Sequence, residues 1–413
     1  MATKLKLGTD NNWATKVDKL LAYNDENGNF KPIQFDADRD STSTRVNKAG
    51  LVENVEANRP RVQFDNNDGY LLLEPSSTNL LQRSEDYANS YWLKARVGSN
   101  ATGFTAPDGS SNATYFEQES GQTTAAVIYK SAFTSASSGI YTFSIWAKKA
   151  DKRYLKFQTR VNSATYRTVF DLQDGIITYD SGNENAKIEE YPNGWFRLSV
   201  QRTSTTTDDI VVYYYLNDSG DFNDTVTDSG GVYIWGSQVE KKDYLTSYIP
   251  TSSAAVTRTL DNAHLLNQTI FTNYPFTVYA KAKLDAIGNT IFSLNNTSSQ
   301  NYYLAFYFPN STQVGLLRRD LSLNDSDFYS FSGSVGTTYK IAVAFVSATA
   351  YKLYIDGTEI ADITSGGSIP FNHDDISLGQ FRITGDTGTR NSIDEFMVFN
   401  EALSDAELIQ LTS

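Results

Sequence analysis

Short runs of alternating apolar and polar residues, separated by clusters of Asn, Asp, Gly and Ser, recur along most of this chain and constrain its fold most strongly. In the run YTFSIWAKK, Phe143 and Ile145 share one side of an extended chain, and Ser144 and Lys148 share the other. Because successive side chains of a β-strand point to opposite faces, such runs predict strands with a core side and a polar side. Short strands at this spacing are typical of a sandwich or barrel, so we predict an all-β protein.

The composition agrees with strands and bounds the number of domains. The chain has 413 residues, including 26 Tyr and 23 Phe but only 2 Met and 2 His. Aromatic residues suit half-buried, pleated strands. A chain of this length exceeds the size at which a single hydrophobic core usually stops growing, so we predict two or three domains.

The charge of the chain argues against several kinds of partner. The formal net charge is −13 and the isoelectric point is near 4.7, which opposes binding to phosphate backbones and anionic lipid. We therefore expect neither nucleic acid nor membrane as a partner. No stretch approaches the roughly 20 apolar residues of a membrane span, and the start, MATKLKLGTD, lacks the apolar core of a signal peptide. Cysteine is absent, which excludes disulfides and thiolate sites.

Residues 10–23 carry a different pattern from the rest of the chain. Trp13, Val17, Leu20 and Leu21 recur at helical spacing behind polar residues that are suitable N-caps, so we predict one short amphipathic helix. An isolated helix of this length is marginal in water. We expect it to be ordered only against another surface, either as an attachment or oligomerisation segment over residues 1–35 or folded back on its own domain.

Two β regions follow this segment and repeat similar runs in the same order. YTFSIWAKK at 141 matches YPFTVYAKA at 274, and IWGSQVE at 234 resembles IDEFMVF at 393. We interpret this internal similarity as two tandem β-sandwiches of related architecture, over residues 36–262 and 263–413. Ser404 and Glu407 have the spacing of a capping box, so we predict a short helix near the end of the second region.

A series of motifs runs through the first β region. In order they are DRDSTSTRV, GLVENV, NRPRVQF, GYLLLEPSSTNLL and, much later, SYIPTSSAAVTR. Over residues 39 to about 258, this series resembles tail-fibre, head-fibre and other surface proteins of bacteriophage particles. Such proteins carry a jelly roll like that of carbohydrate-binding modules between these motifs. Residues 270–411 resemble laminin-G or concanavalin A-like sandwiches, and Ile393 to Ser404 match the ending of that family closely.

The resemblance has implications for partners and location. It implies binding to host-surface or environmental glycans, attachment to other virion proteins through residues 1–35, and a place on the virion surface after synthesis in the host cytoplasm. It also implies a homo-oligomer, with a trimer favoured. The fold we expect is therefore a jelly-roll sandwich and a concanavalin A-like sandwich behind a short helical attachment segment.

Residue patterns that carry catalysis are missing from the sequence. His264 and His373 are the two histidines and lie far apart, and no HExxH, GxSxG or phosphate-binding glycine loop occurs. Cleavage of a polysaccharide would need two carboxylates flanking the bond, or a Tyr or His base with a charge-neutralising partner. No strand carries an ExDxE spacing that would align carboxylates on one face. We therefore predict a binding protein that is not an enzyme. Two alternatives stay open, a polysaccharide depolymerase and a structural decoration protein that binds no sugar.

Aromatic residues on the polar sides of strands are the best candidates for a ligand site. A sugar stacks its C–H face on an aromatic ring and binds its hydroxyls to planar polar groups. If the strands belong to one sheet, two tryptophans and four hydrogen-bonding residues would form such a surface: Trp146, Trp195, Lys148, Gln158, Arg160 and Arg197. The same residue types are enriched at subunit interfaces, so that interpretation also stays open. Trp92 and Trp235 are expected in core or edge packing.

The acidic loop NDSGDFNDTVTDSGG is the best candidate for a metal site. Asp218, Asp221 and Asp224 supply enough oxygens to coordinate Ca²⁺ if the loop folds around an ion, although the loop does not match the EF-hand pattern. A solvated acidic turn explains the same sequence. Asp374 and Asp375 are a second, weaker candidate. We expect that no cofactor is required.

Overall fold

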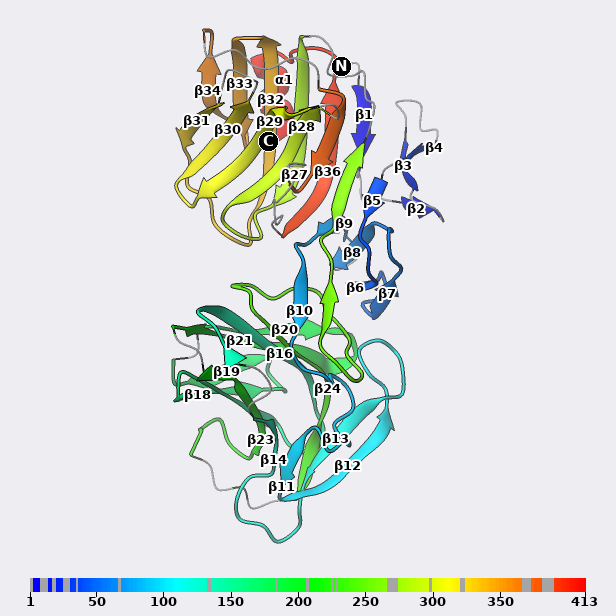
Figure 1. The fold of residues 1–413 in the computed structure, drawn as a ribbon, viewed down its shortest axis with the longest axis vertical. Coiled ribbons are helices and arrows are strands. Elements are labelled where there is room, and N and C mark those ends of the chain that lie inside the picture. The colour runs from blue at the N-terminus through cyan, green and yellow to red at the C-terminus, as the bar shows by residue number, and fades with distance from the viewer. Residues whose placement is uncertain are drawn as a thin grey trace. The chain divides into compact units, whose positions relative to one another are not determined.

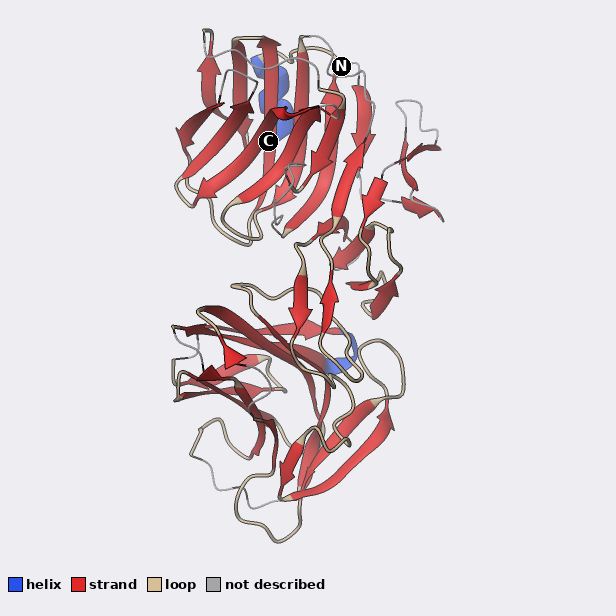
Figure 2. Ribbon diagram, viewed as in Figure 1, coloured by secondary structure: helices blue, strands red, loops and turns tan. Residues whose placement is uncertain are grey.

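The structure is a computed structural model that describes residues 3–7, 14–16, 20–24, 30–34, 36–65, 68–131, 135–182, 184–205, 208–223, 226, 229–265, 274–296, 299–319, 324–365, 373–380 and 390–413. Strands make up almost all of the regular structure in these residues (Figure 2), which confirms the predicted all-β class. The chain divides into unit 1, residues 1–48, 54–76 and 259–413, and unit 2, residues 49–53 and 77–258. No helix in the described part has the length and apolar character needed to cross a membrane.

Unit 2 contains two six-stranded antiparallel sheets (Figure 1). The first, which we call the tyrosine sheet, has the strand order β11 (Leu93–Ala95), β14 (Val127–Lys130), β23 (Val211–Asn217), β17 (Tyr154–Val161), β18 (Ala164–Asp171) and β19 (Ile176–Asp180). The second, which we call the tryptophan sheet, has the order β12 (Val97–Phe104), β13 (Ala113–Gln118), β24 (Gly230–Glu240), β16 (Gly139–Lys149), β21 (Trp195–Ser204) and β20 (Glu184–Tyr191).

The core of unit 2 unites the apolar sides of both sheets, as the alternation predicts. Phe143 of β16 and Phe157 of β17 are fully buried in one cluster. Tyr214 of β23 packs on Phe157 with ring centroids 5.1 Å apart, and Trp92 lies 6.0 Å from Tyr214. The prediction of core packing for Trp92 is therefore confirmed. A shift of one residue in any of these strands would turn its apolar side outward, so burial fixes the register.

Unit 1 also contains two large sheets, seen as two layers in Figure 1. One has the order β34 (Thr358–Ile363), β33 (Ala350–Ile355), β32 (Thr338–Ser347), β27 (Phe276–Lys283), β36 (Asn391–Phe399), β9 (Asp68–Leu73) and β8 (Arg61–Asp65), with β1 (Thr3–Leu7) also paired to β36. The other has the order β31 (Asn324–Ser330), β30 (Gln313–Arg319), β29 (Ser299–Asn310), β28 (Asn289–Asn296), β35 (Asp375–Leu378), β26 (Asn262–Leu265) and β5 (Asp36–Asp38).

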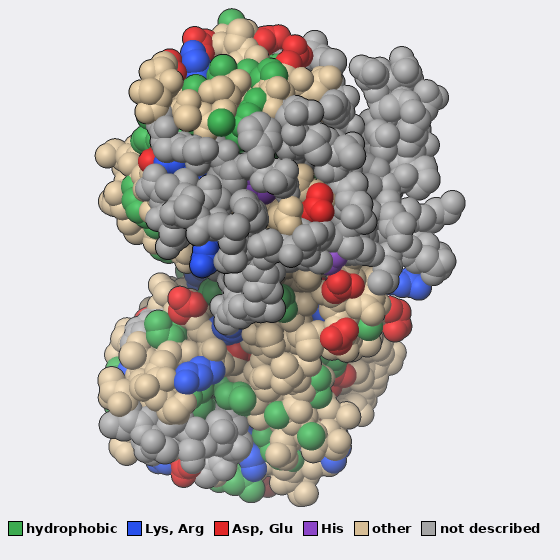
Figure 3. Space-filling model, turned by 45° about the horizontal axis from the view of Figure 1, so that its top comes forward, with side chains coloured by type: hydrophobic (Ala, Val, Ile, Leu, Met, Phe, Trp, Pro, Cys, Tyr) green, Lys and Arg blue, Asp and Glu red, His purple; other side chains and the backbone are tan. Residues whose placement is uncertain are grey.

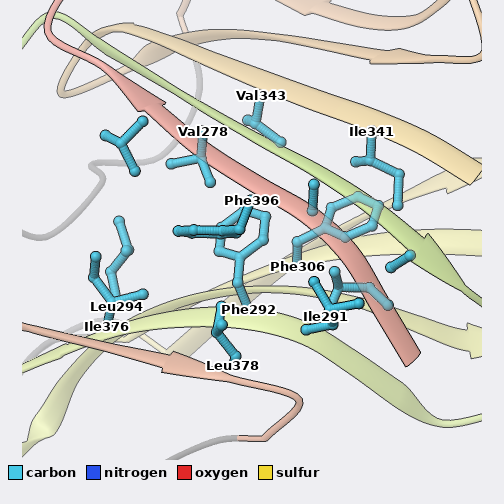
Figure 4. Packing of buried hydrophobic residues seen from close by; sticks show 14 of the residues in the cluster. Val278, Ile291, Phe292, Leu294, Phe306, Ile341, Val343, Ile376, Leu378 and Phe396 are labelled. Atoms are coloured by element: carbon cyan, nitrogen blue, oxygen red, sulfur yellow. The ribbon is translucent and has the colours of Figure 1, made fainter. Parts of the chain in front are cut away.

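The core of unit 1 lies between these layers. Phe292 of β28 and Phe396 of β36 come from different sheets, and their ring centroids lie 6.0 Å apart (Figure 4). The helix α1 (Asp405–Thr412) buries Leu408 in a separate cluster with residues of β27, β32, β33 and β36. Its capping box is formed by Ser404 and Glu407, with the Ser404 amide donating to the Glu407 carboxylate at 2.9 Å. The Ser404 hydroxyl also donates to this carboxylate, at 2.8 Å. The predicted C-terminal helix is therefore confirmed.

The observed units differ from the predicted boundaries after residues 35 and 262. β5, β8 and β9 precede residue 77 but belong to the sheets of unit 1, where Leu71 of β9 lies opposite Ile393 of β36. The chain of unit 2 enters at β10 (Ser77–Asn79) and leaves at β25 (Val256–Arg258), and these two strands pair. Alternation predicts strands but not partners so distant in sequence. Two further short pairs join β6 (Ser43–Val46) to β7 (Val52–Val55) and β15 (Ser135–Ala136) to β22 (Asp208–Asp209).

The helix predicted over residues 10–23 is wrong where the structure describes that segment. β2 (Ala14–Lys16) and β3 (Leu20–Asn24) are strands, and with β4 (Phe30–Gln34) they form an antiparallel sheet. Leu20 and Leu21 therefore lie in β3, whereas Trp13 and Val17 lie outside the described residues. Nucleating a short helix is costly, while the sequence DENGN between β3 and β4 has the composition of a hairpin turn, which favours strand pairing.

Candidate functional site

The tryptophan pair that the sequence suggests as a ligand surface is buried. Trp146 of β16 and Trp195 of β21 belong to one sheet, but they are only 1% and 2% exposed. Val52, at the start of β7, and Tyr248, from the loop after β24, join them and Trp235 in a second hydrophobic cluster on the outer side of the tryptophan sheet. The prediction that Trp146 and Trp195 face solvent is therefore wrong. Alternation shows which side of a strand a residue takes, but not whether a loop covers that side.

The expected partnership of tryptophan and arginine is present inside this cluster. The Cζ atom of Arg197 lies 4.2 Å from the ring centroid of Trp146, and Arg197 is 5% exposed. A cation–π contact gains strength when it is desolvated, so this pair stabilises the tryptophan sheet. Lys148 lies half-buried in the same sheet, opposite Trp195 and Tyr233 in the strand register. These four predicted residues thus do not form an open surface.

The remaining two candidates, Gln158 and Arg160, belong to β17 of the tyrosine sheet. Arg160 is exposed and Gln158 is 9% exposed. Both side chains take the outer side of the sheet, because their neighbours Phe157 and Val161 point into the core. The predicted set of six residues is therefore divided between two sheets. Gln158 and Arg160 lie beside a group of tyrosines that the sequence analysis did not single out.

A row of tyrosine rings crosses the outer side of the tyrosine sheet. Tyr129 of β14 lies opposite Tyr213 of β23, with ring centroids 5.2 Å apart and ring planes 18° apart. Tyr215 follows on the same face of β23, and its ring lies 5.9 Å and 19° from that of Tyr213. All three side chains are partly exposed. Residues two apart on a strand share a face and cross-strand neighbours are close, so strand geometry places the three rings side by side, two across neighbouring strands and the third along β23.

Polar groups of β17 and β18 continue this row. Gln158 lies opposite Tyr213, and Arg167 lies opposite Gln158 and donates from Nε to its Oε1 at 2.8 Å. Lys156 lies opposite Tyr215, with Nζ 4.8 Å from the ring centroid. We call this surface the tyrosine face. Its members are Tyr129, Tyr213, Tyr215, Lys156, Gln158 and Arg167.

The loop after β23 supports one end of the tyrosine face. Phe222 packs on Tyr179 with ring centroids 4.5 Å apart, and the Cζ atom of Arg167 lies 5.4 Å from the centroid of the Phe222 ring. Nζ of Lys156 donates to the Phe222 carbonyl oxygen at 3.1 Å. Because Arg167 and Lys156 are already held by these contacts, a ligand would lose less side-chain entropy on binding them.

Positive charge lies close to the tyrosine rings. Burial raises the pKa of the Tyr215 phenol and Tyr213 adds to that rise, whereas the positive charges of Arg167 and Arg96 oppose it. Arg96 is fixed by a hydrogen bond from Nε to the Ala125 carbonyl oxygen at 2.9 Å. With a raised pKa, Tyr215 is neutral at pH 7, so its hydroxyl is able to donate as well as accept hydrogen bonds.

Figure 3 shows how side-chain types are distributed over one face of the molecule. There, hydrophobic side chains are dispersed among polar ones. A second group of partly exposed rings, Phe104, Tyr115 and Tyr233, lies on the tryptophan sheet, with ring planes tilted by 49° to 52°. The tyrosine face differs from it in that its neighbouring rings are near-parallel, at 18° and 19°. The sequence run VVYYYLN carries the signal for this face, because its alternation places Tyr213 and Tyr215 on one side and Tyr214 on the other.

The acidic loop does not gather its carboxylates around one point where it is described. Asp218 pairs with the ammonium of Lys152, Asp221 is exposed, and Asp224 lies outside the described residues. Of the second candidate pair, Asp375 is buried and accepts a hydrogen bond from Asn295 at 3.2 Å. The described residues contain no group of three or more His, Asp or Glu placed to hold a metal. Calcium binding stays a prediction.

The motif series builds buried polar frameworks. In unit 1, Arg61 is fully buried, donates to Glu74 at 2.8 Å and pairs with Asp261, while Arg39 donates to Asp261 at 2.8 Å. In unit 2, Asn79 is fully buried, and its side-chain amide bonds to four backbone groups, the carbonyls of 237 and 249 and the amides of 81 and 239. These motif residues specify the fold, because their polar groups bind other parts of the protein.

Comparison with known proteins adds a family for the C-terminal region. Residues 257–409 match the family model described as the concanavalin A-like lectin/glucanases superfamily. Solved structures with similar folds include the CBM40 of a Ruminococcus gnavus IT-sialidase bound to α2,3-sialyllactose, at 21% identity and a TM-score of 0.32 over 35% of this chain and 86% of that chain. The NanB sialidase from Streptococcus pneumoniae is 21% identical, with a TM-score of 0.32 over 36% of this chain and 26% of that chain.

A third similar structure is a SAP-like pentraxin from Limulus polyphemus, 15% identical, with a TM-score of 0.28 over 34% of this chain and 70% of that chain. A comparison with curated protein sequences gave no match. The matched superfamily includes both lectins and glucanases, so its name alone does not separate sugar binding from sugar cleavage. The family match and the two packed sheets of unit 1 show that the C-terminal region has the concanavalin A-like fold that the sequence predicts.

Proposed function

We propose that the protein binds a glycan chain on its tyrosine face and acts as a non-catalytic adhesin on the surface of a bacteriophage particle. The observation that carries the proposal is the row of three near-parallel tyrosine rings that continues into Gln158 and Arg167. Aromatic rings match the C–H faces of sugars, and planar amide and guanidinium groups match their hydroxyls. The row therefore supplies both kinds of contact that a sugar needs.

The extent of the row favours a polysaccharide over a single sugar. It crosses the four adjacent strands β14, β23, β17 and β18, and three strand spacings of about 4.8 Å give about 14 Å. An extended ligand could contact several of the members at once. Each single contact is expected to be weak, so several copies on one particle would raise the overall affinity through avidity.

Two further observations support the proposal at different levels. Residues 257–409 match a superfamily that includes lectins, which supports sugar binding by the C-terminal region of this chain. The place on a virion is supported by the motif series over residues 39 to about 258. Immunogold labelling of purified particles with an antibody to the protein tests that place. Particles that carry no label and contain no copy of the protein would exclude it.

Binding is tested by titrating purified protein with surface polysaccharide from the host in affinity gel electrophoresis. Replacing Tyr213 by Ala should weaken binding at least tenfold, which corresponds to about 1.4 kcal/mol. Tyr213→Phe keeps the ring and should change the affinity less than threefold. The matched control is Tyr233→Ala on the tryptophan sheet, where Tyr233 also packs on another ring, that of Phe104, at 4.9 Å. Unchanged binding by Tyr213→Ala, or equal loss in Tyr233→Ala, would contradict the assignment.

The same samples separate binding from cleavage. The molecular size of the polysaccharide should stay constant during prolonged incubation with the protein, as measured by size-exclusion chromatography with light scattering. A falling polymer size would favour the depolymerase alternative. Absence of binding to every host glycan on an array would favour the decoration protein that binds no sugar.

A further inference from the structure

We infer that the tyrosine face selects acidic polysaccharides, in which the sugars carry carboxylate groups, over neutral polysaccharides of the same backbone. This inference rests on the proposed function, because it specifies the ligand of the same site. The observation behind it is a surplus of cationic side chains on and beside the face, in a chain whose net charge is −13.

The surplus is visible along the strand register. One row of neighbours across the sheet is Leu93, Tyr129, Tyr213, Gln158 and Arg167. The next row is Ala95, Val127, Tyr215, Lys156, Val169 and Tyr179. All of these residues are described, two of them are cationic, and none of them is acidic. Arg160 is exposed two residues along β17 from Gln158, and Arg96 directly follows β11.

The carboxylates on the outer side of the same strands do not cancel this charge. Asp171, at the end of β18, already pairs with Arg153, whose Nε donates to it at 2.7 Å. It also accepts the backbone amide of Gln173 at 2.9 Å. Asp209 belongs to β22, which pairs with β15 and not with a strand of the tyrosine sheet. Lys156 is only 8% exposed, and its Nζ already donates to the Phe222 carbonyl oxygen. The positive charge that a ligand meets therefore comes from the partly exposed Arg167 and the exposed Arg160.

The type of cation points to a carboxylate as the matching group. Arginine presents a planar fork of donors that binds a carboxylate through two parallel hydrogen bonds. Arg167 uses Nε for Gln158, so its two Nη groups are available for a ligand. Arg160 is exposed. A sugar ring on Tyr213 would bring a ring carboxylate close to both guanidiniums, because Gln158, the neighbour of Tyr213, lies opposite Arg167 and two residues from Arg160 on the same face of β17.

The test compares three uronate-containing polysaccharides, namely polygalacturonate, alginate and hyaluronan, each with its carboxyl-reduced neutral form. Carboxyl reduction keeps linkage and length while it removes the charge. By isothermal titration calorimetry, the intact protein should bind at least one acidic polymer tenfold or more tightly than its reduced form. Raising NaCl from 50 to 500 mM should weaken binding of the acidic form and leave binding of the neutral form within twofold, because salt screens the charges.

Variants connect this preference to the tyrosine face. The double variant Arg160→Gln with Arg167→Gln should lower the acidic-to-neutral preference below threefold. The matched control, Arg83→Gln with Lys149→Gln, removes the same charge from unit 2 outside the face and should keep the full preference. Tyr213→Ala should weaken binding of both polymers. Tryptophan fluorescence against urea verifies that each variant is folded.

The outcomes separate the inference from the proposed function. Equal binding of an acidic polymer and its reduced form would overturn the inference and leave glycan binding standing. A preference that survives in the double variant would place the selective cations elsewhere and overturn the inference as well. If the protein binds none of the six polymers, the inference is overturned. If it binds none of the host glycans either, the proposed function is overturned as well.

Discussion

Replacing Asp261 by Ala should destabilise unit 1 far more than removal of an exposed aspartate. Asp261 accepts hydrogen bonds from Arg39 at 2.8 Å, from Arg61, and from the backbone amide of Glu74 at 2.9 Å. Burial alone would lower the pKa of Arg61, but Asp261 and Glu74 outweigh it and raise that pKa. Without Asp261, two nearly inaccessible guanidiniums, 2% and 0% exposed, lose a shared carboxylate.

The size of the effect follows from the burial of this group. Removing one partner of a buried ion pair costs about 3 to 5 kcal/mol, because the remaining charge stays desolvated. With a urea m-value of about 3 kcal/mol per M, the unfolding midpoint of unit 1 should fall by about 1 to 2 M. The control Asp362→Ala removes an exposed partner of Lys352, at 3.4 Å and 39% exposed, and should cost at most about 1 kcal/mol.

The distribution of tryptophan makes the assay specific to one unit. Trp92, Trp146, Trp195 and Trp235 all lie in unit 2, and Trp13 is the fifth tryptophan of the chain. In a Trp13→Phe background, tryptophan fluorescence follows unit 2, while far-UV circular dichroism follows both units. Asp261→Ala should shift the transition seen by circular dichroism and leave the fluorescence transition in place. Equal midpoints for Asp261→Ala and Asp362→Ala would refute the argument that this buried group stabilises the unit.

Three further changes test other parts of the structure. Trp146→Ala should lower the stability of unit 2 by about 3 to 5 kcal/mol, because it empties the centre of a buried cluster; a fluorescence midpoint unchanged in urea would show that the cluster is open. Gly315→Ala places a Cβ 2.5 Å from Cε1 of Tyr307 and 3.2 Å from Cδ1 of Phe328. It should lower the free energy of unfolding of unit 1 by about 1 to 3 kcal/mol. The loss should be smaller in a Tyr307→Ala background if the contact with Tyr307 is the cause. Burial lowers the pKa of His373 to about 4, below its unfolded value of about 6.5. The unfolded state therefore binds the proton first, and unit 1 should lose up to about 3 kcal/mol as the pH falls from 7 towards 4. In His373→Gln, the difference between urea midpoints at pH 7 and pH 4.5 should shrink, and an undiminished difference would assign it to other groups.

Sequence patterns predict the local features of this fold well and the distant ones poorly. Alternation places Phe143 and Phe157 in the core because side-chain direction depends only on position along a strand. The capping box at Ser404 is equally local. The pairing of Leu71 with Ile393 depends on a strand more than three hundred residues away, and no local pattern specifies it. The failed helix over 10–23 shows the same limit, because its strands gain stability from pairing with one another.

The candidate ligand site was harder to predict, because the exposure of a side chain depends on which other segments of the chain cover it. The alternation assigns Trp146 correctly to the outer side of its strand, yet Val52 and Tyr248 cover that side. Gln158 is also only 9% exposed, but its neighbours on the face, Tyr213 and Tyr215, are partly exposed and lie in a run whose alternation was available. What the sequence could not supply is the pairing that brings Tyr129 beside Tyr213.

The residues that carry the resemblance to virion surface proteins and the residues of the tyrosine face are different sets with different physical roles. Arg61 and Glu74, and likewise Asn79, have their polar groups bound to other parts of the protein, so substitution would damage folding before it changed recognition. Tyr129 and Tyr213 are partly exposed on a sheet whose other side forms the core, so substitution there would change a ligand contact and leave the framework intact. A chain with the same motif series is therefore expected to share this frame without sharing its glycan. The ligand has to be inferred from the outer side of β14, β23, β17 and β18 in each chain separately.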